Sequence, residues 1–174
     1  MRWERLFADL EGQLAAGVAE QGRWDVADLV RAERAQVGLV DRLRAAVGAR
    51  VRVRLADGGE PLEGEVVDAG TDWLLLGVAG HRRAVVPLTA LDVVSGLPVA
   101  VAPPAGRVES RLGLAHVLRA LARDRASVTV RTRGGMLTGR VERVGADHVD
   151  LTPDAAGSGW STVTFGALCA VVSA

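Results

Sequence analysis

The sequence contains an internal duplication. Residues 37–76, shifted by 75 positions without a gap, fall on residues 112–151 with 14 identities in 40 positions. The identical pairs are Gly38/Gly113, Leu39/Leu114, Leu43/Leu118, Arg44/Arg119, Ala45/Ala120, Arg50/Arg125, Val53/Val128, Gly59/Gly134, Leu62/Leu137, Gly64/Gly139, Val66/Val141, Gly70/Gly145, Asp72/Asp147 and Leu76/Leu151. After a three-residue difference in loop length, Val93-Val94-Ser95 matches Val171-Val172-Ser173. An ungapped match of this length predicts that one supersecondary unit occurs twice.

Hydrophobic periodicity predicts that each repeat is a short helix followed by five strands. Apolar residues alternate with arginines over residues 50–55, which is the pattern of a half-exposed strand. Asp57-Gly58-Gly59 and Gly70-Thr71-Asp72 are turn sequences that bound the next strand. The predicted strands cover residues 51–55, 62–68, 73–76, 84–88 and 91–94, then 128–130, 137–144, 148–151, 161–165 and 168–172, with a helix over 113–122 before the second set.

The N-terminal segment has a helical period instead. Trp3, Leu6, Leu10 and Leu14 recur at three- and four-residue steps, the spacing of an amphipathic helix. Asp25 is suited to the N-cap of a second helix. We therefore expect a helical hairpin over residues 1–37, whose apolar stripe serves as core or as a surface for self-association.

The duplicated unit resembles the Sm-like fold, a short helix followed by five strongly bent strands. Leu62-Glu63-Gly64-Glu65-Val66 and Leu137-Thr138-Gly139-Arg140-Val141 look like the second strand of that family, where a glycine accompanies a sharp bend. Residues 164–173 are similar to the last two strands of bacterial Sm-like RNA chaperones. The pattern also fits other SH3-like barrels, including those appended to ribosome-assembly factors and biotin ligases.

The residues through which this family contacts RNA are replaced here. The family has an Asp after the second-strand glycine, and this chain has Gly70 and Gly145 there. The Asn that follows it in eukaryotic members is replaced by Leu74 and Val149. The Lys-His pair of bacterial members is replaced by Pro87-Leu88 and Phe165-Gly166. No RNA-contacting residue of the family is therefore carried over.

The resemblance implies a mainly β fold of the α+β class. We expect the N-terminal helical hairpin over 1–37, a first five-stranded small barrel with its leading helix over 38–97, a Pro/Gly linker over 98–111, and a second such barrel over 112–174. Unpaired strands at the barrel edges favour pairing with another unit. The two units are expected to pair within the chain, and the outer edges or the hairpin to bind a protein partner or another copy.

Charge gives only a weak signal for nucleic acid. The chain has 21 basic and 21 acidic residues, whereas nucleic-acid binders usually carry a basic excess. Residues 101–174 hold nine arginines against six acidic residues, and residues 51–100 hold four against seven. The second repeat is therefore mildly basic and the first mildly acidic.

In each repeat, a residue with a ring side chain follows the aspartate of an equivalent turn. Trp73 follows Asp72, and His148 follows Asp147. Both rings are candidates for stacking on unpaired bases of single-stranded RNA. The structural alternative is that the aspartates close the turns and that Trp73, which runs into Leu74-Leu75-Leu76, belongs to the core.

The tentative phosphate-binding residues are arginines on predicted strands. Arg52 and Arg54 belong to the first repeat, and Arg131, Arg133 and Arg140 to the second. Guanidinium groups suit phosphate oxygens. The alternative is a solvated edge strand whose charges keep it soluble, with nearby acidic side chains neutralising that face.

No enzyme, metal or cofactor signature is present in the sequence. The three histidines share no ligand spacing, and no nucleophile elbow or phosphate-binding glycine loop occurs. Cys169, the single cysteine, lies in an apolar run and is expected to be a small core residue. The charged N-terminus is unlike a signal peptide, and the longest apolar stretch is too short for a bilayer, so we expect a cytoplasmic protein that does not bind membranes.

Two functions of different classes remain. One is a non-enzymatic Sm-like protein that binds single-stranded RNA or regulates RNA. The other is a protein–protein adaptor built from degenerate barrels. The fold resemblance and the basic second repeat favour the first, although fold alone does not imply function.

Overall fold

A computed structural model describes residues 36–103, 106, 112–125, 127–154 and 159–173. The helical hairpin predicted over residues 1–37 lies outside the described residues, apart from its last two. The chain divides into two units between Gly38 and Leu39. The fold below is that of the second unit.

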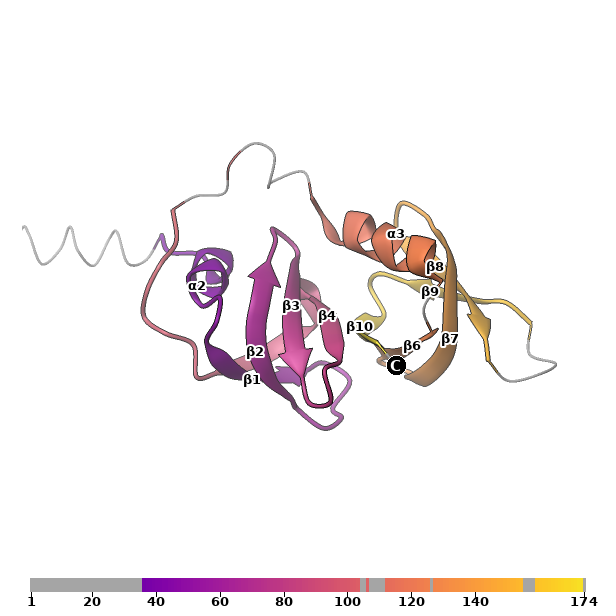
Figure 1. Cartoon of the computed structure of the whole chain (residues 1–174), viewed down its shortest axis with the longest axis horizontal. Helices are drawn as coiled ribbons and strands as arrows, with labels where there is room; N and C mark the ends of the chain where they lie inside the picture. The colour runs from indigo at the N-terminus through magenta and orange to yellow at the C-terminus, as the bar shows by residue number, and fades with distance from the viewer. Residues whose placement is uncertain (1–35, 104–105, 107–111, 126, 155–158, 174) are drawn as a thin grey trace, which may run out of the picture. The chain divides into compact units, whose positions relative to one another are not determined.

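Each repeat is a helix followed by five strands, as predicted (Figure 1). The first repeat comprises α2 (Leu39–Ala45), β1 (Arg50–Leu55), β2 (Leu62–Ala69), β3 (Trp73–Val78), β4 (Arg83–Pro87), the short 3-10 helix η1 (Leu88–Ala90) and β5 (Leu91–Ser95). The second comprises α3 (Leu114–Asp124), β6 (Ser127–Thr132), β7 (Gly135–Val144), β8 (His148–Pro153), β9 (Ser161–Thr164) and β10 (Leu168–Ser173). The prediction of a mainly β fold is confirmed.

The ten strands form one antiparallel sheet in the order β5-β1-β2-β3-β4-β10-β6-β7-β8-β9. Each repeat supplies five neighbouring strands, and the two sets meet where β4 pairs with β10. Two separately closed barrels are therefore not what the structure shows, because the sheet is open and ends at β5 and β9. The fourth strand of one repeat pairs with the fifth strand of the other, which satisfies the backbone groups of both. The prediction that the two repeats pair with each other within the chain is confirmed.

A glycine in the second strand of each repeat is required by close backbone packing. A Cβ at Gly64 would overlap the carbonyl oxygen of Gly77, and a Cβ at Gly139 would overlap that of Thr152. Both strands contain a bulge a few residues later, between Val66 and Asp68 in β2 and at the equivalent place in β7. Bulges bend a strand and increase its twist, so the bent second strand predicted from the sequence occurs in both repeats.

The register of the first strand corrects the ungapped alignment. Val51 lies opposite Gly64, whereas Val128 lies opposite Gly139. Val51, not Val53, is therefore the counterpart of Val128, at a shift of 77. The same shift relates β5 to β10, so Val93 corresponds to Ala170 and the predicted match of Val93-Val94-Ser95 with Val171-Val172-Ser173 is wrong by one residue. The segment from the buried helix leucine, Leu43 or Leu118, to the first strand is longer by two residues in the second repeat, where α3 is the longer helix. The following turn is shorter by two residues, so the two changes cancel in the sequence.

The shift of 77 also changes two identities. Arg125 ends α3 in a left-handed conformation and is not equivalent to Arg50 at the start of β1. Arg54 and Arg131 become counterparts, since each precedes the same register irregularity in its strand. The partner strand, not residue identity, determines which positions are equivalent.

Two hydrophobic clusters form the core, one in each repeat, and the two central strands contribute to both. In β4, Ala84 and Val86 belong to the first cluster and Val85 to the second. In β10, Ala170 and Val172 belong to the first cluster and Val171 to the second, and Cys169 is buried, as predicted. Period-two alternation sends neighbouring side chains to opposite faces, so pairing β4 with β10 completes both cores.

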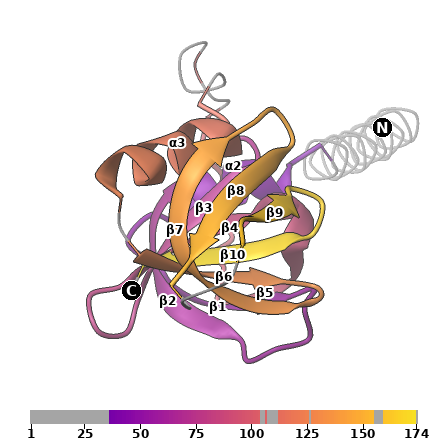
Figure 2. The same ribbon diagram turned by 90° about the vertical axis from the view of Figure 1, so that its right-hand side faces the viewer.

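The helices occupy equivalent positions in the two repeats. α2 packs on β2, and α3 packs on β7. Figure 2, turned so that the second repeat faces the viewer, shows α3 beside β7 and β8. Leu43 and Leu118, which are counterparts, are the fully buried residues by which these helices enter the cores.

Candidate functional site

The most heavily bonded polar site joins the two repeats. Arg131, on β6, makes a bidentate ion pair with Asp57, in the turn between β1 and β2, with Nε–Oδ2 at 2.7 Å and Nη2–Oδ1 at 2.9 Å. The third guanidinium nitrogen donates to the carbonyl of Glu60 at 2.9 Å. The Arg131 and Asp57 side chains are only 10% and 8% exposed. Paired, hydrogen-bonded charges of this kind fix geometry as well as adding energy, so the site clamps the second repeat onto the first.

A second contact set lies at the turn between β2 and β3. The Trp73 indole Nε1 donates to the carbonyl of Leu112 at 2.7 Å, and the Leu114 amide donates to the Asp72 carboxylate at 2.9 Å. Asp72 therefore accepts a hydrogen bond from one of the amides that a helix leaves unbonded at its start, although Asp72 belongs to the other repeat. These contacts dock α3 onto the first repeat.

The central strands complete the joint. Val85 lies opposite Val171 and Ala84 opposite Val172. The Arg83 amide donates to the Ser173 hydroxyl at 2.9 Å. We call the β4–β10 pairing, together with the Arg131 clamp and the Asp72–Trp73 contacts, the repeat joint.

The sheet ends at β5 and β9, which we call the outer edges. β5 corresponds to β10, and β9 corresponds to β4. In the described part of the chain each of them pairs with a strand on one side only. Their exposure differs from that of their counterparts: Val93 is 47% exposed, whereas Ala170 is fully buried.

In the described part of the chain, two carboxyl groups have lowered pKa values. Burial opposes ionisation of Asp57, but the hydrogen bonds from Arg131 and from the Gly59 amide outweigh it and lower the pKa. The hydrogen bond from His148 lowers the pKa of Asp147, whose side chain is 88% exposed. Burial raises the pKa of the Cys169 thiol, so Cys169 is a structural side chain, not an activated nucleophile.

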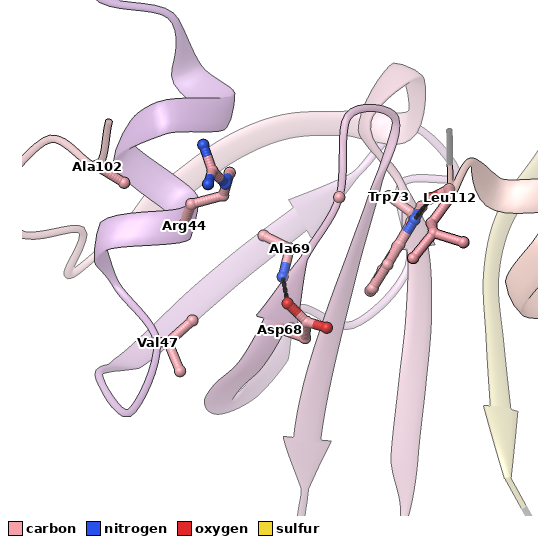
Figure 3. A pocket seen from close by; sticks show the side chains of 8 residues that line it. Arg44, Val47, Asp68, Ala69, Trp73, Ala102 and Leu112 are labelled. Carbon is pink, nitrogen blue, oxygen red and sulfur yellow. Dashed lines mark hydrogen bonds between the residues drawn. The ribbon is translucent and has the colours of Figure 1, made fainter. Parts of the chain in front are cut away.

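A surface pocket of about 290 Å³ lies between α2 and the start of β3 (Figure 3). Trp73, Val47 and Leu112 provide its apolar lining, and Arg44 and Asp68 its charges. The dashed lines in Figure 3 mark two hydrogen bonds within the protein. The Ala69 amide donates to the Asp68 carboxylate at 2.8 Å, and the Trp73 indole donates to the Leu112 carbonyl. The lining contains no pair of a nucleophile and a base.

The described residues contain no cluster of three His, Cys, Asp or Glu side chains that could hold a metal ion. Among the same residues, no helix has the length and apolar character needed to cross a bilayer.

The structure does not gather the arginines predicted to bind phosphate. Arg131 is committed to Asp57, and Arg52 pairs with Glu63 at 3.3 Å, both side chains being exposed. Arg54, Arg133 and Arg140 are exposed and make no ion pair with another described residue. β1 lies between β5 and β2, so the edge-strand part of the alternative is wrong for Arg52 and Arg54. The Arg52–Glu63 ion pair agrees with its other part, neutralisation by nearby acidic side chains.

The two predicted stacking residues occupy equivalent turns but different environments. Trp73 is 7% exposed and belongs to the hydrophobic core, which confirms that part of the structural alternative. The other part is wrong, because the Asp72 carboxylate accepts from the Leu114 amide and the Asp147 carboxylate contacts His148. The His148 side chain is 37% exposed, and its Nδ1 lies 2.8 Å from Asp147 Oδ1. Each ring covers the glycine of its own turn, because a Cβ at Gly70 or Gly145 would overlap it.

Sequence reasoning missed the partners that hold the repeats together. Asp57 belongs to a turn that reads as an ordinary Asp-Gly-Gly sequence, and it lies 74 residues from Arg131. The sequence carries no signal for this contact, because the ungapped alignment places Asp57 opposite Thr132. Only the strand register makes Gly134 its counterpart, in a turn that is two residues shorter.

No protein-family model matches the chain, and no curated protein matches it significantly.

Proposed function

We propose that this chain is a non-enzymatic protein–protein interaction module that binds its partners by pairing a strand with an outer edge of the sheet. The observation that carries the proposal is the repeat joint itself. There the chain joins two copies of one unit through β4 and β10, while the equivalent strands β9 and β5 end the sheet. Strand addition to a free sheet edge is a general mode of protein recognition.

The arginine environment supports an adaptor over an RNA-binding protein. The most buried candidate, Arg131, is held by a carboxylate inside the joint, and Trp73 is in the core. Neither side chain is available to a phosphate or a base. We further propose that each helix-plus-five-strand repeat is a unit of the Sm-like type. The helix, the five strands and the glycine-centred bend in both second strands support this resemblance.

RNA binding is the second candidate, favoured by the exposed Arg54, Arg133, Arg140 and Arg143. A labelled single-stranded RNA of mixed sequence, titrated at low and then rising salt, separates the candidates. An RNA-binding protein would lose affinity steeply with salt, and Arg140→Ala would reduce the binding. We expect no measurable binding. Salt-sensitive binding that depends on Arg140 would favour RNA and contradict the adaptor.

The adaptor is tested by blocking its edges. Thr162→Pro removes an edge amide from β9, and Val93→Glu places a charge on β5. Val47→Glu is the matched control, since Val47 is 55% exposed and lies outside both outer edges. Tagged chains are expressed in the source cells, and proteins that co-purify are compared. We expect proteins retained by the wild type and by Val47→Glu to be lost from an edge variant. Identical recovery from all four chains would contradict strand-edge binding.

A further inference from the structure

We infer that the outward face of the second repeat excludes a further copy of this chain and that the partner of β9 is a hydrophilic strand of another protein. This inference rests on the proposed function and names the partner's chemistry. The outward face is the side of the sheet that points away from the core of its own repeat. In the second repeat it consists of alternate residues of β8 and β9, namely His148, Asp150, Thr152, Thr162 and Thr164.

The first repeat shows what this face does when a neighbouring repeat covers it. Strand pairing identifies the counterparts, which are Trp73/His148, Leu75/Asp150, Gly77/Thr152, Val85/Thr162 and Pro87/Thr164. Trp73 and Val85 are buried in the hydrophobic cluster of the second repeat, and Leu75 packs against that cluster. The second repeat therefore docks on an outward face that is apolar.

The second repeat has a polar side chain at each of these five positions, and the change is confined to one side of the sheet. The inward residues of the same strands stay apolar, since Val149, Leu151 and Val163 are buried. Val85 is 4% exposed, whereas its counterpart Thr162 is exposed. Because the difference lies at the positions that contact a neighbouring repeat, the substitutions bear on that contact and not on the core of the repeat itself.

Polar groups of this face bond to one another or to their own turn. The Thr162 hydroxyl donates to the Asp150 carboxylate at 2.7 Å, and His148 Nδ1 lies 2.8 Å from Asp147 Oδ1. Covering the face with a further copy would remove water from the Asp150 carboxylate and from the Asp147–His148 pair. Burial of a charged group is unfavourable unless new hydrogen bonds replace those to water.

The surface that a further copy would bring to this face is largely apolar. In the repeat joint, Leu114 of α3 and Val171 of β10 belong to the cluster that covers the outward face of the first repeat. Their counterparts in the first repeat, Leu39 and Val94, line a surface pocket of about 440 Å³. Leu39 is 43% exposed. A further copy would therefore place an apolar leucine against charged side chains.

The two charged side chains that line this pocket do not compensate. Arg42 already donates to the carbonyls of Pro98 at 3.0 Å and of Leu97 at 3.5 Å. Asp92 carries the same charge as Asp150. Placing an apolar surface opposite a polar one is a general means by which an interface excludes a wrong partner.

A hydrophilic strand suits the same face. The Phe165 amide donates back to the Asp147 carbonyl at 2.7 Å. Amides of an antiparallel strand alternate between its two sides, so the Thr162 and Thr164 amides face away from β8. A strand that pairs with them places its own side chains beside the two threonines, where hydroxyl side chains are favourable neighbours.

Exclusion of a further copy is tested by restoring the apolar face. The triple variant His148→Trp, Asp150→Leu, Thr162→Val, which we call the restored variant, carries the residues of the first repeat. Sedimentation velocity of the full-length protein over a concentration series should show self-association at least about tenfold tighter than that of the wild type. Leu39→Glu in the same chain should cancel the gain, because it places a charge on the opposing surface. A restored variant that associates no better than the wild type would overturn the inference.

A matched control separates this contact from nonspecific aggregation. The variant His116→Trp, Asp124→Leu, Thr138→Val makes the same three exchanges at exposed positions away from the outward face, and it should associate like the wild type. An equal gain in this control would contradict the assignment. Wild-type self-association that Thr162→Pro abolishes would also contradict it, since β9 would then already bind a copy. Self-association that Thr162→Pro leaves unchanged arises at another surface and agrees with the inference.

The partner's chemistry is tested with two labelled peptides of about eight residues. One alternates serine with threonine, the other alternates serine with valine, and both have the same charged ends. Fluorescence anisotropy should show that the wild type prefers the serine–threonine peptide at least about tenfold, and that the restored variant prefers the serine–valine peptide. Equal affinity of the wild type for both peptides would overturn this inference alone.

Binding of neither peptide to either chain would contradict the strand-edge function and, with it, the hydrophilic partner. The sedimentation result judges the exclusion of a further copy independently of that outcome.

Discussion

Arg131 and Asp57 form a bidentate ion pair that joins β6 of the second repeat to the first turn of the first repeat, with both side chains at least 90% buried. Arg54, the counterpart of Arg131, is exposed. One position of the duplicated unit is therefore a clamp in one repeat and a surface residue in the other. The difference arises because, among the described residues, only one of the two repeats has a neighbouring repeat at that side.

Breaking the clamp should destabilise the fold. Asp57→Asn and Arg131→Met each leave a buried partner without its counter-charge, which costs on the order of 3 kcal/mol. The two losses should not add in the double variant, because they remove the same interaction. Urea unfolding measures the free energies, and Arg54→Met is the matched control, with an expected change within about 0.5 kcal/mol. Additive losses would show that the two residues act separately.

The clamp should also make stability depend on acid pH. The pKa of Asp57 is lowered in the folded chain, so its contribution is fully present above the unfolded value of about 3.9. It is lost as the pH falls through the folded value. The stability difference between wild type and Asp57→Asn should therefore shrink as the pH is lowered from about 6 to about 2 in urea titrations. Asp124→Asn, at an exposed site, should follow the wild type closely.

The bend glycines should not tolerate alanine. Gly64→Ala and Gly139→Ala would each force a methyl group onto the carbonyl of the neighbouring strand, at a cost of about 2 kcal/mol or more. Gly166→Ala is the control, since a Cβ there has nothing within 4 Å. Thermal unfolding followed by circular dichroism gives the comparison, and a Gly64→Ala chain as stable as Gly166→Ala would contradict the close approach.

The Trp73 indole should contribute more than apolar area. Trp73→Phe keeps a ring in the core but removes the donor to Leu112, with an expected loss of about 1–2 kcal/mol. Trp160→Phe is the matched control, because Trp160 is 65% exposed. Urea unfolding followed by circular dichroism measures both. Equal stability of the two variants would mean that the Leu112 contact adds nothing.

The sequence was sufficient for the local elements. Period-two alternation and short apolar runs bounded by turn sequences located every strand to within a few residues, because burial of a strand dictates which of its positions are apolar. The duplication and the burial of Cys169 followed from residue type and spacing, whereas the bend at Gly64 and Gly139 was predicted from the resemblance to the second strand of the Sm-like fold. The predicted mainly β class follows from the same patterns.

Sequence reasoning failed where a contact joins distant positions. The ungapped alignment matched Val53 with Val128, but hydrogen bonding to the second strand makes Val51 the counterpart, and no residue identity reports that register. The prediction of two closed barrels failed for the same reason. Whether β4 closes on its own unit or pairs with β10 depends on edges that lie far apart in the chain.

What the sequence determined is that one bent unit occurs twice and which of its residues are apolar, since these depend on side-chain chemistry and local spacing. Only the tertiary structure decided how the units are joined. It placed Arg131 against Asp57, Trp73 against Leu112 and β4 against β10, and it left β5 and β9 at the ends of the sheet. The physical reason is that strand pairing and ion pairing depend on which groups meet in space, and a repeated sequence offers the same groups in both of its copies.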